Sequence, residues 1–313
     1  PEDAYLLRGY LQAQGIEVFP QDGSGLTSSD QILVASAAIE DTVADILRGK
    51  ELGCARMTRA ELLSELFNES ELPIAVGGTS GKSTVTGMIG WILASAGRDP
   101  TIMNGAMMKD FVDASTPFAT ARTGKGDAFV SEVDESDGSI ALYRPAIAVL
   151  SNVSEDHKDM DELRGLFGDF ARVSRQVVWN ADDTETAAII RSVTPADTLS
   201  FGFSDGADLR ATDLAPGPTA SGFTPHEGDQ RHSVRLKVPG RHNVANALAA
   251  IGAARAAGVG TADCVAAIQH FTGLARRFDI VGETNGVTVI HDFGHNPNKV
   301  SATLEGMKQF PGP

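Results

Sequence analysis

The chain has 313 residues, of which 42% are hydrophobic and 6% aromatic, and it carries a formal net charge of -15. This composition is typical of a globular protein with about two domains. The strongly acidic balance argues against nucleic acid and anionic membranes as partners, so a bound phosphate group would require a local positive site.

The sequence contains no apolar run of 18 residues and no signal-peptide pattern. Cys54 and Cys264 lie too far apart to form a C-x-x-C pair, and two such cysteines make no disulfide framework. This cysteine usage suits a reducing compartment, so we expect a cytoplasmic protein in which both thiols serve packing.

Residues 1–70 predict alternating helices and strands, as in one half of a doubly wound α/β domain. The expected helices cover 5–14, 42–52 and 59–67, and the expected strands cover 16–19 and 31–35. Thr58 is the expected N-cap of the last helix, with Glu61 at the capping-box position. A Rossmann-like unit normally opens with a strand and a glycine-rich turn, whereas this chain is expected to start in the helix that would follow them.

The stretch PIAVGGTSGKSTVTGMIGWILASAG, residues 73–97, predicts a buried strand, a glycine-rich loop and a helix in that order. Unpaired N–H groups at the helix start, together with the positive end of its dipole, would hold an anion. Lys82 would contact terminal phosphates and the Ser83 hydroxyl would ligate magnesium. The strict P-loop pattern has a glycine where Val76 stands, and the alternative is a glycine-rich turn before an ordinary helix.

Carboxylates follow the next buried strand, predicted at 128–133. In open α/β sheets ligands bind at the carboxyl ends of the strands, so we expect Glu132 to reach a magnesium ion that Ser83 also holds. For Asp134, Glu135 and Asp137 we favour a solvated turn.

His157 follows the strand predicted at 145–150 and should reach the same sheet edge as Glu132. A lone loop histidine is usually a surface residue, but its convergence with a carboxylate and a phosphate loop favours a metal ligand.

The remainder of the chain predicts further elements. The expected helices are 163–174, 243–254, 262–271 and 298–308, the expected strands are 100–103, 176–179 and 287–291, and short antiparallel strands are expected within 195–238. His242 and Asn243 stand at a helix start, either as part of a capped core helix or as a site for an anion or a base edge. Asn285 and Gly286 predict a hairpin turn.

Four motifs occur in this order: GGTSGKST, EVDESDGS with SEDH, GRHNVANALAA, and ARRF with HDFGHNP. Together they resemble the Mur ligase family, ATP-dependent ligases that join an amino acid or a peptide to a carboxylate through an acyl phosphate. The resemblance implies ATP and Mg²⁺ as cofactors and small-molecule substrates, among them a UDP-sugar. It also implies no carbamylated lysine, because residues 167–179 contain no lysine.

The resemblance also implies the site residues. The catalytic residues would be Lys82, Glu132 and His157, and the magnesium ligands Ser83, Glu132 and His157. The nucleotide would be held by Gly78, Thr79, Ser80, Gly81, Lys82, Ser83, Thr84, His242, Asn243, Asn246, Arg277 and Asp292.

We therefore predict an α/β chain in three parts. Residues 1–70 form a partial Rossmann-like part, and residues 71–274 form a central P-loop domain with a mostly parallel, doubly wound sheet and an antiparallel patch. Residues 275–313 form a linker and the start of a third α/β domain. Residues 279–313 are too few to form a core of their own. The expected acid is UDP-N-acetylmuramate, in peptidoglycan synthesis, and the expected state is a monomer or homodimer. Two alternatives stay open. The missing glycine-rich loop and the HDFGHNP motif, in which His291 stands where the family usually has an acidic residue, favour a ligase for another acid, cyanophycin-like or a small metabolite. The short part after residue 275 would permit a non-catalytic ATP-binding relative.

Overall fold

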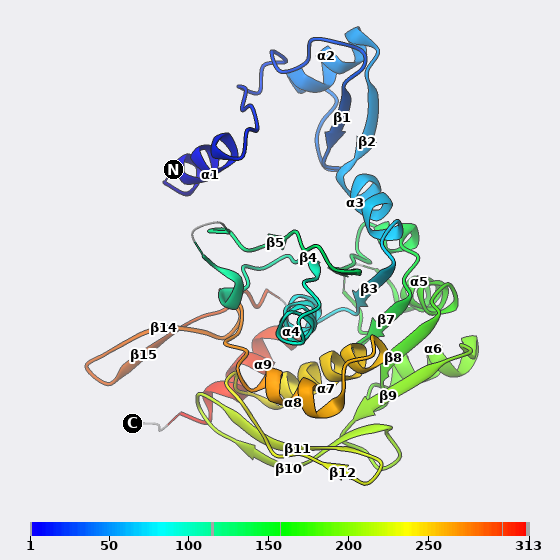
Figure 1. Ribbon diagram of the computed structural model, residues 1–313, viewed down its shortest axis with the longest axis vertical. Helices are drawn as coiled ribbons and strands as arrows, with labels where there is room; N and C mark the ends of the chain where they lie inside the picture. Colours follow the sequence, from blue (N-terminus) through cyan, green and yellow to red (C-terminus); the bar gives the residue numbers. More distant parts are fainter. Residues whose placement is uncertain (1, 114–115, 157, 296, 311–313) are drawn as a thin grey trace. The chain divides into compact units, whose positions relative to one another are not determined.

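The computed structural model describes residues 2–113, 116–156, 158–295 and 297–310. Contacts within the chain divide it into two units, residues 1–66 and residues 67–313 (Figure 1).

The first unit contains a two-stranded parallel sheet with helices around it. Its elements are α1 (Glu2–Ala13), β1 (Ile32–Ala35), α2 (Ala44–Leu52), β2 (Ala55–Thr58) and most of α3 (Arg59–Asn68). Strands β1 and β2 pair from Ile32 with Ala55 to Ala35 with Thr58. The predicted capping box is confirmed, because the Thr58 N–H donates to Glu61 Oε2 at 2.6 Å and the Glu61 N–H donates to Thr58 Oγ1 at 3.1 Å.

One predicted strand of this unit is wrong. Residues 16–19 form irregular chain, and Ile16 and Phe19 are each 50% exposed. Their alternating pattern suits a strand, but no strand among the described residues pairs with them. The strand that does pair with β1 is β2, which the sequence pattern did not single out.

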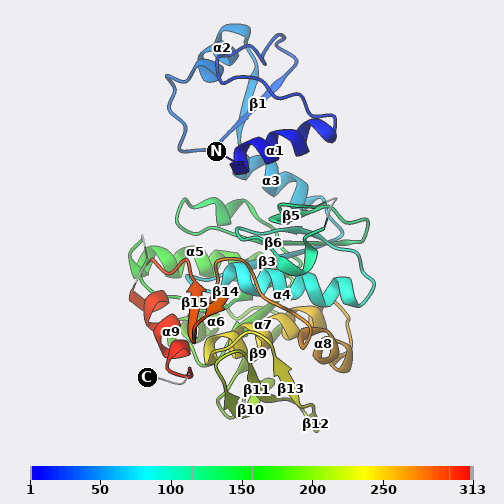
Figure 2. The same ribbon diagram turned by 90° about the vertical axis from the view of Figure 1, so that its left-hand side faces the viewer.

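The second unit is built on one large sheet. Its strands are β3 (Leu72–Gly77), β4 (Thr101–Met103), β5 (Ala121–Arg122), β6 (Ala128–Glu132), β7 (Ile147–Leu150), β8 (Gln176–Asn180), β9 (Thr198–Gly202), β10 (Leu209–Pro216), β11 (Ser221–Glu227), β12 (Gln230–Arg231) and β13 (Val234–Leu236). The strand order is β12-β11-β10-β9-β8-β7-β3-β6-β4-β5, and β13 pairs with β11. Neighbours from β4 to β10 are parallel. Strands β11, β12 and β13 form an antiparallel patch at one edge (Figure 2), and β5 pairs antiparallel with β4 at the other. The predicted mostly parallel sheet with an antiparallel patch is confirmed.

Helices cover both faces of this sheet, as in a doubly wound fold. They are α4 (Lys82–Ser95), α5 (Met160–Arg172), α6 (Thr184–Val193), α7 (Arg241–Ala256) and α8 (Thr261–Ile268), with short 3-10 turns η1 (Lys109–Phe111) and η2 (Ser139–Leu142). Figure 1 shows α5 and α6 on one side of the sheet and α4, α7 and α8 on the other. Helix α6, which the sequence pattern did not predict, is capped by Asp183, whose side chain accepts from the Thr186 N–H.

The core of the second unit lies between β3 and helices α4 and α7. Strand β3 is buried from Pro73 onward, and the apolar side chains of α4 that repeat at helical spacing are fully buried. The alanine-rich sequence of α7 lets this helix pack closely on the same face of the sheet. The start of α4 is thereby held at the carboxyl end of the central strand.

The last elements of the second unit are β14 (Asp279–Thr284), β15 (Val287–His291) and α9 (Pro297–Met307). The predicted hairpin is confirmed: β14 and β15 are antiparallel, and Asn285 and Gly286 both have positive φ at the turn. Contacts group these residues with the large sheet, whereas the division of the chain at 70/71 and 274/275 stays a prediction.

The two cysteines differ in environment. Cys54, in the first unit, is half-buried, whereas Cys264 on α8 is fully buried, and this burial raises the pKa of its thiol to about 12. No helix within the described ranges has the length and hydropathy that crossing a membrane requires.

Candidate active site

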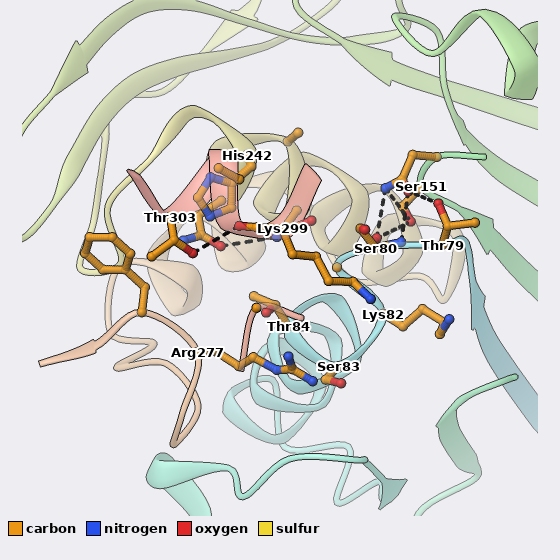
Figure 3. Close-up of a pocket in the computed structure, with 18 of the residues that line it drawn as sticks. Thr79, Ser80, Lys82, Ser83, Thr84, Ser151, His242, Arg277, Lys299 and Thr303 are labelled. Carbon is orange, nitrogen blue, oxygen red and sulfur yellow. Dashed lines mark hydrogen bonds between the residues drawn. The ribbon is translucent and has the colours of Figure 1, made fainter. Parts of the chain in front are cut away.

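A cavity of about 490 Å³ opens at the carboxyl edge of the large sheet (Figure 3). Its lining comes from the start of α4 with the loop before it, the chain after β7, the end of β8 with the N-cap of α6, strand β9, the start of α7, and the chain from Arg277 into α9. The lining residues are Thr79, Ser80, Gly81, Lys82, Ser83, Thr84, Ser151, Asn152, Ser154, Asn180, Asp183, Phe201, His242, Asn243, Ala245, Asn246, Arg277, Phe278, Asp292, Gly294, Lys299, Ala302 and Thr303. Most of the residues predicted for the nucleotide therefore meet in one cavity.

The phosphate loop, residues 77–82, requires glycine at two positions. Gly78 has φ +129° and Gly81 has φ +87°, both in the region that L side chains rarely adopt. A Cβ at Gly78 would collide with Ser151 Oγ, and one at Gly81 would lie 2.7 Å from Asn246 Oδ1. Both glycines allow neighbouring chain segments to approach the loop closely.

Asn152, which sequence reasoning missed, holds the loop in place. Its Oδ1 accepts from the Ser80 N–H at 2.9 Å and from Thr79 Oγ1 at 2.9 Å, while its Nδ2 donates to the Ser80 carbonyl at 2.8 Å. The Thr79 N–H also donates to the Asn152 carbonyl at 3.0 Å. The position of Asn152 just past the end of β7, a buried strand that neighbours β3, is a signal that the sequence offers.

The Lys82 side chain extends from the start of α4 (Figure 3), and its ammonium group makes two short contacts. Its Nζ donates to Glu135 Oε2 at 2.7 Å and to the Gly78 carbonyl at 2.8 Å. The expected solvated turn is wrong for Glu135, which is 3% exposed, although Asp134 and Asp137 are exposed as expected. Glu135 is buried because the ammonium group neutralises its charge.

Ser83 and Glu132 lie together as expected. Ser83 Oγ donates to Glu132 Oε2 at 2.7 Å, and Gly105 leaves room for this carboxylate, since a Cβ there would collide with Glu132 Oε1. Asn104 Nδ2 donates to the Ser83 carbonyl at 3.0 Å and supports the helix start. A hydroxyl and a carboxylate oxygen are hard ligands of the kind that Mg²⁺ prefers. His157, the third predicted ligand, lies outside the described residues.

The start of α7 brings three predicted residues to the cavity. Asn243 Nδ2 donates to the Pro239 carbonyl at 2.7 Å, and Asn246 Nδ2 donates to Asn243 Oδ1 at 3.2 Å, so both amides are held in fixed orientations. The His242 ring faces the cavity (Figure 3). Desolvation by the surrounding protein lowers the pKa of His242, while the negative charge of Asp292 opposes that shift.

The opposite side of the cavity is formed by the chain around β15. Asp292 accepts from the Phe278 N–H at 2.8 Å and from the Gly294 N–H at 2.7 Å, so each of its carboxylate oxygens is fixed by the backbone. Arg277 lies with its guanidinium 5.1 Å from the centre of the Phe293 ring. Lys299 and Thr303, on α9, also line the cavity and were not predicted.

A doubly wound parallel sheet, with a glycine-rich loop between its central strand and a helix that starts in Lys-Ser-Thr, defines an α/β protein of the P-loop class. Residues 76–254 match the Mur ligase middle domain. The chain belongs to the Mur ligase family, and the resemblance in its motifs is thereby confirmed.

The relatives agree with this assignment. The chain is 35% identical to the UDP-N-acetylmuramate--L-alanine ligase of Nitratidesulfovibrio vulgaris over 301 residues, which cover 94% of the chain and 64% of that protein. A ligase of the same name from Clavibacter sepedonicus is also 35% identical, over 96% of the chain and 63% of that protein. The chain thus spans slightly less than two thirds of the length of these relatives.

Solved structures share the fold. A UDP-N-acetylmuramate-alanine ligase of Thermotoga maritima has a TM-score of 0.81 at 24% identity, over 96% of this chain and 69% of that one. A murein peptide ligase of Psychrobacter arcticus has a TM-score of 0.81 at 25% identity, over 96% of this chain and 68% of that one.

Proposed function

We propose that this chain is an ATP-dependent ligase that joins L-alanine to the carboxylate of UDP-N-acetylmuramate in the cytoplasm. One observation carries the proposal: a single cavity unites the phosphate loop, the start of α7 and the chain from Arg277 to Thr303. The names of relatives at 35% identity support the choice of acid and amine. In this proposal the nucleotide binds to the central domain, residues 71–274, with further contacts from residues 275–313.

The phosphates of ATP would bind at the start of α4. The backbone N–H groups of the phosphate loop and the positive end of the helix dipole favour an anion there. Lys82 lies in the same loop, so its ammonium group can move from Glu135 to a phosphate oxygen. On the opposite side of the cavity Arg277 would add a second cation.

The base and the ribose would lie between α7 and β15. His242 and Asn243 sit at the start of α7, where polar edges of a base can pair with them. Asp292 keeps lone pairs for ribose hydroxyls although each oxygen already accepts from the backbone. Asn246 would act indirectly, because it packs against Gly81 of the phosphate loop.

The oxygens of Ser83 and Glu132 fit a magnesium ion, and His157 would complete the set. When bound, the ion would neutralise charge on the phosphate oxygens and align the substrate carboxylate. Glu132 is held for this role by its hydrogen bond from Ser83 and by the space that Gly105 leaves.

The chemistry proposed for this site has three steps. The substrate carboxylate attacks the γ-phosphate of ATP and forms an acyl phosphate with release of ADP. The amine then attacks the activated carbonyl, and the tetrahedral intermediate expels phosphate. The chain needs no nucleophilic side chain, because its contribution is to align the phosphates and to neutralise growing charge with Lys82 and Arg277.

ADP release in the presence of magnesium, ATP and UDP-N-acetylmuramate tests the proposal. We expect release that depends on L-alanine and is lost in Lys82→Ala but kept in Lys308→Ala, a control on an exposed lysine of α9. Turnover with another acid but not with UDP-N-acetylmuramate would overturn the proposed substrate. ATP binding without turnover on any acid would overturn the ligase activity and leave a non-catalytic ATP-binding relative.

A further inference from the structure

Helix α9 places a lysine over the phosphate loop. Lys299 lies in the first turn of this helix, and its side chain extends across the cavity toward the loop (Figure 3). Ala302 and Thr303 line the same cavity from positions three and four residues further on. Residues at these spacings share one helix face, so α9 presents a continuous face to the cavity.

Packing fixes the position of this face. A Cβ at Gly306 would lie 2.7 Å from the ring of Phe278, so the absence of a side chain lets α9 rest directly on that ring. Phe278 is itself buried and lines the cavity, and its N–H donates to Asp292. The Thr303 hydroxyl donates to the Lys299 carbonyl at 3.1 Å within the helix. Lys299 is therefore carried by a supported element, although its own side chain is long and flexible.

The contacts of Lys299 differ from those of Lys82. Lys299 Nζ lies 3.5 Å from Asp156 Oδ2 and 3.2 Å from His295 Nε2, whereas Lys82 Nζ lies 2.7 Å from Glu135. Charge-assisted N–H···O bonds are usually about 2.7–2.9 Å long, so the Lys299–Asp156 contact is longer than such a bond. Lys299 lines the cavity beside the phosphate loop, and a phosphate oxygen there, with its own negative charge, can accept from its ammonium group as a carboxylate does.

We propose that Lys299 is a phosphate-contacting residue, which turns from Asp156 to the polyphosphate of the nucleotide when the site fills. This inference rests on the proposed function, because it takes ATP as the ligand of the cavity. Lys299 would be a third cation beside Lys82 and Arg277, and it comes from α9, which is far from the phosphate loop in the sequence. It also links the position of α9 to the phosphates, since the helix contributes a ligand to them.

The inference predicts a dependence on the number of phosphates. A single ammonium group acts as a point charge, and its attraction grows with the negative charge within reach. Removal of the Lys299 charge should weaken the binding of ATP strongly, the binding of ADP less, and the binding of adenosine hardly at all. A lysine that serves only the fold would change all three alike, through loss of the folded state.

Binding of ATP, ADP and adenosine by the whole chain, measured by isothermal calorimetry, tests this. We expect Lys299→Gln to weaken ATP about tenfold, with most of that loss recovered in Lys299→Arg. Lys308→Gln removes the same charge from the same helix, but this lysine is 66% exposed, pairs with Glu305 and does not line the cavity. It should leave all three affinities unchanged.

The possible outcomes separate the role of Lys299 from the proposed function of the chain. If ATP binds the unaltered chain, Lys82→Ala weakens it and Lys299→Gln does not, the inference is overturned and the proposed function stands. If Lys299→Gln lowers the affinity for adenosine as much as for ATP, or lowers the melting temperature well below that of Lys308→Gln, its role is structural and the inference is again overturned. If the unaltered chain binds no ATP, both proposals fall.

Discussion

The two walls of the cavity are built in different ways. The loop wall, residues 77–84 with the segments after β6 and β7, is held mainly by buried groups and by hydrogen bonds to the backbone. The helix wall, residues 277–303, presents charged side chains from a hairpin and a helix whose outer faces are exposed. In the proposed site the first wall would recognise a phosphate by its shape, and the second would add charge. Damage to the loop wall should therefore cost stability as well as affinity, whereas damage to the helix wall should cost mainly affinity.

The largest effect should come from Gly78→Ala. The new Cβ meets Ser151 Oγ, and the residue must keep φ near +129°, so we expect the free energy of unfolding to fall by about 3 kcal/mol and ATP binding to be lost. Gly97→Ala is the matched control, because Gly97 also has positive φ, +75°, but nothing lies within 4 Å of its Cβ position. It should cost about 1 kcal/mol and keep ATP binding. Urea unfolding and calorimetry measure both, and equal losses in the two variants would contradict the steric account.

Asn152→Ala should come next. It removes the amide that joins Ser80 to the chain after β7 and leaves partly buried polar groups unpaired, so we expect a loss of about 2 kcal/mol in unfolding free energy and at least tenfold weaker ATP binding. Asn68 makes a similar two-way contact, with the Leu142 carbonyl and the Arg144 N–H, but away from the cavity. If Asn68→Ala weakened ATP binding as much as Asn152→Ala, the hydrogen bonds between Asn152 and Ser80 would not be the cause of the loss.

Glu135→Gln tests the ion pair within the loop wall. Without nucleotide the variant should be less stable by about 2 kcal/mol, because Lys82 loses a buried partner. Saturating ATP should narrow that difference, since a phosphate replaces the carboxylate. Asp161→Asn removes an exposed partner of Arg164 and should change little with or without ATP. Melting curves at several ATP concentrations give the comparison, and a difference independent of ATP would mean that Lys82 stays on Glu135.

The smallest effect should be that of Gly306→Ala, in the part of α9 that follows the helix wall. Alanine in a helix is favoured over glycine by about 1 kcal/mol, but here the Cβ presses on the Phe278 ring, so we expect almost no net change in stability and a twofold to threefold loss in ATP affinity. Gly165 in α5 has open space around its Cβ position, so Gly165→Ala should raise the free energy of unfolding by about 1 kcal/mol. A stabilised Gly306→Ala with unchanged affinity would show that α9 does not rest on that ring.

The loop wall could be predicted from the sequence to a large extent because its strand, loop and helix are adjacent in the chain. Apolar spacing predicted α4, and the positions of Lys82 and Ser83 at the start of this helix and of Glu132 at the end of β6 made them candidates for the site. Glu135 was misjudged, since a carboxylate in a polar run is usually solvated and only the fold brings Lys82 beside it. Asn152 was missed for a related reason: only the fold brings it beside the Ser80 backbone and the Thr79 hydroxyl.

The helix wall was harder to predict. Arg277 and Asp292 came from a family motif, whereas Lys299 looks like any charged residue on an exposed helix, and its approach to the phosphate loop depends on how Gly306 packs on Phe278. In the first unit the strand expected at 16–19 does not form, because an alternating apolar pattern also needs a pairing partner.

The unequal cysteines give this chain a built-in reporter of motion between its units. At neutral pH the buried Cys264 carries almost no thiolate, so a maleimide dye should attach to Cys54 alone, within residues 1–66. The chain has two tryptophans, Trp91 and Trp179, and both belong to residues 67–313. Energy transfer from these indoles to a dye on Cys54 therefore reads the separation of the two units without any substitution, and ATP can be titrated against it directly.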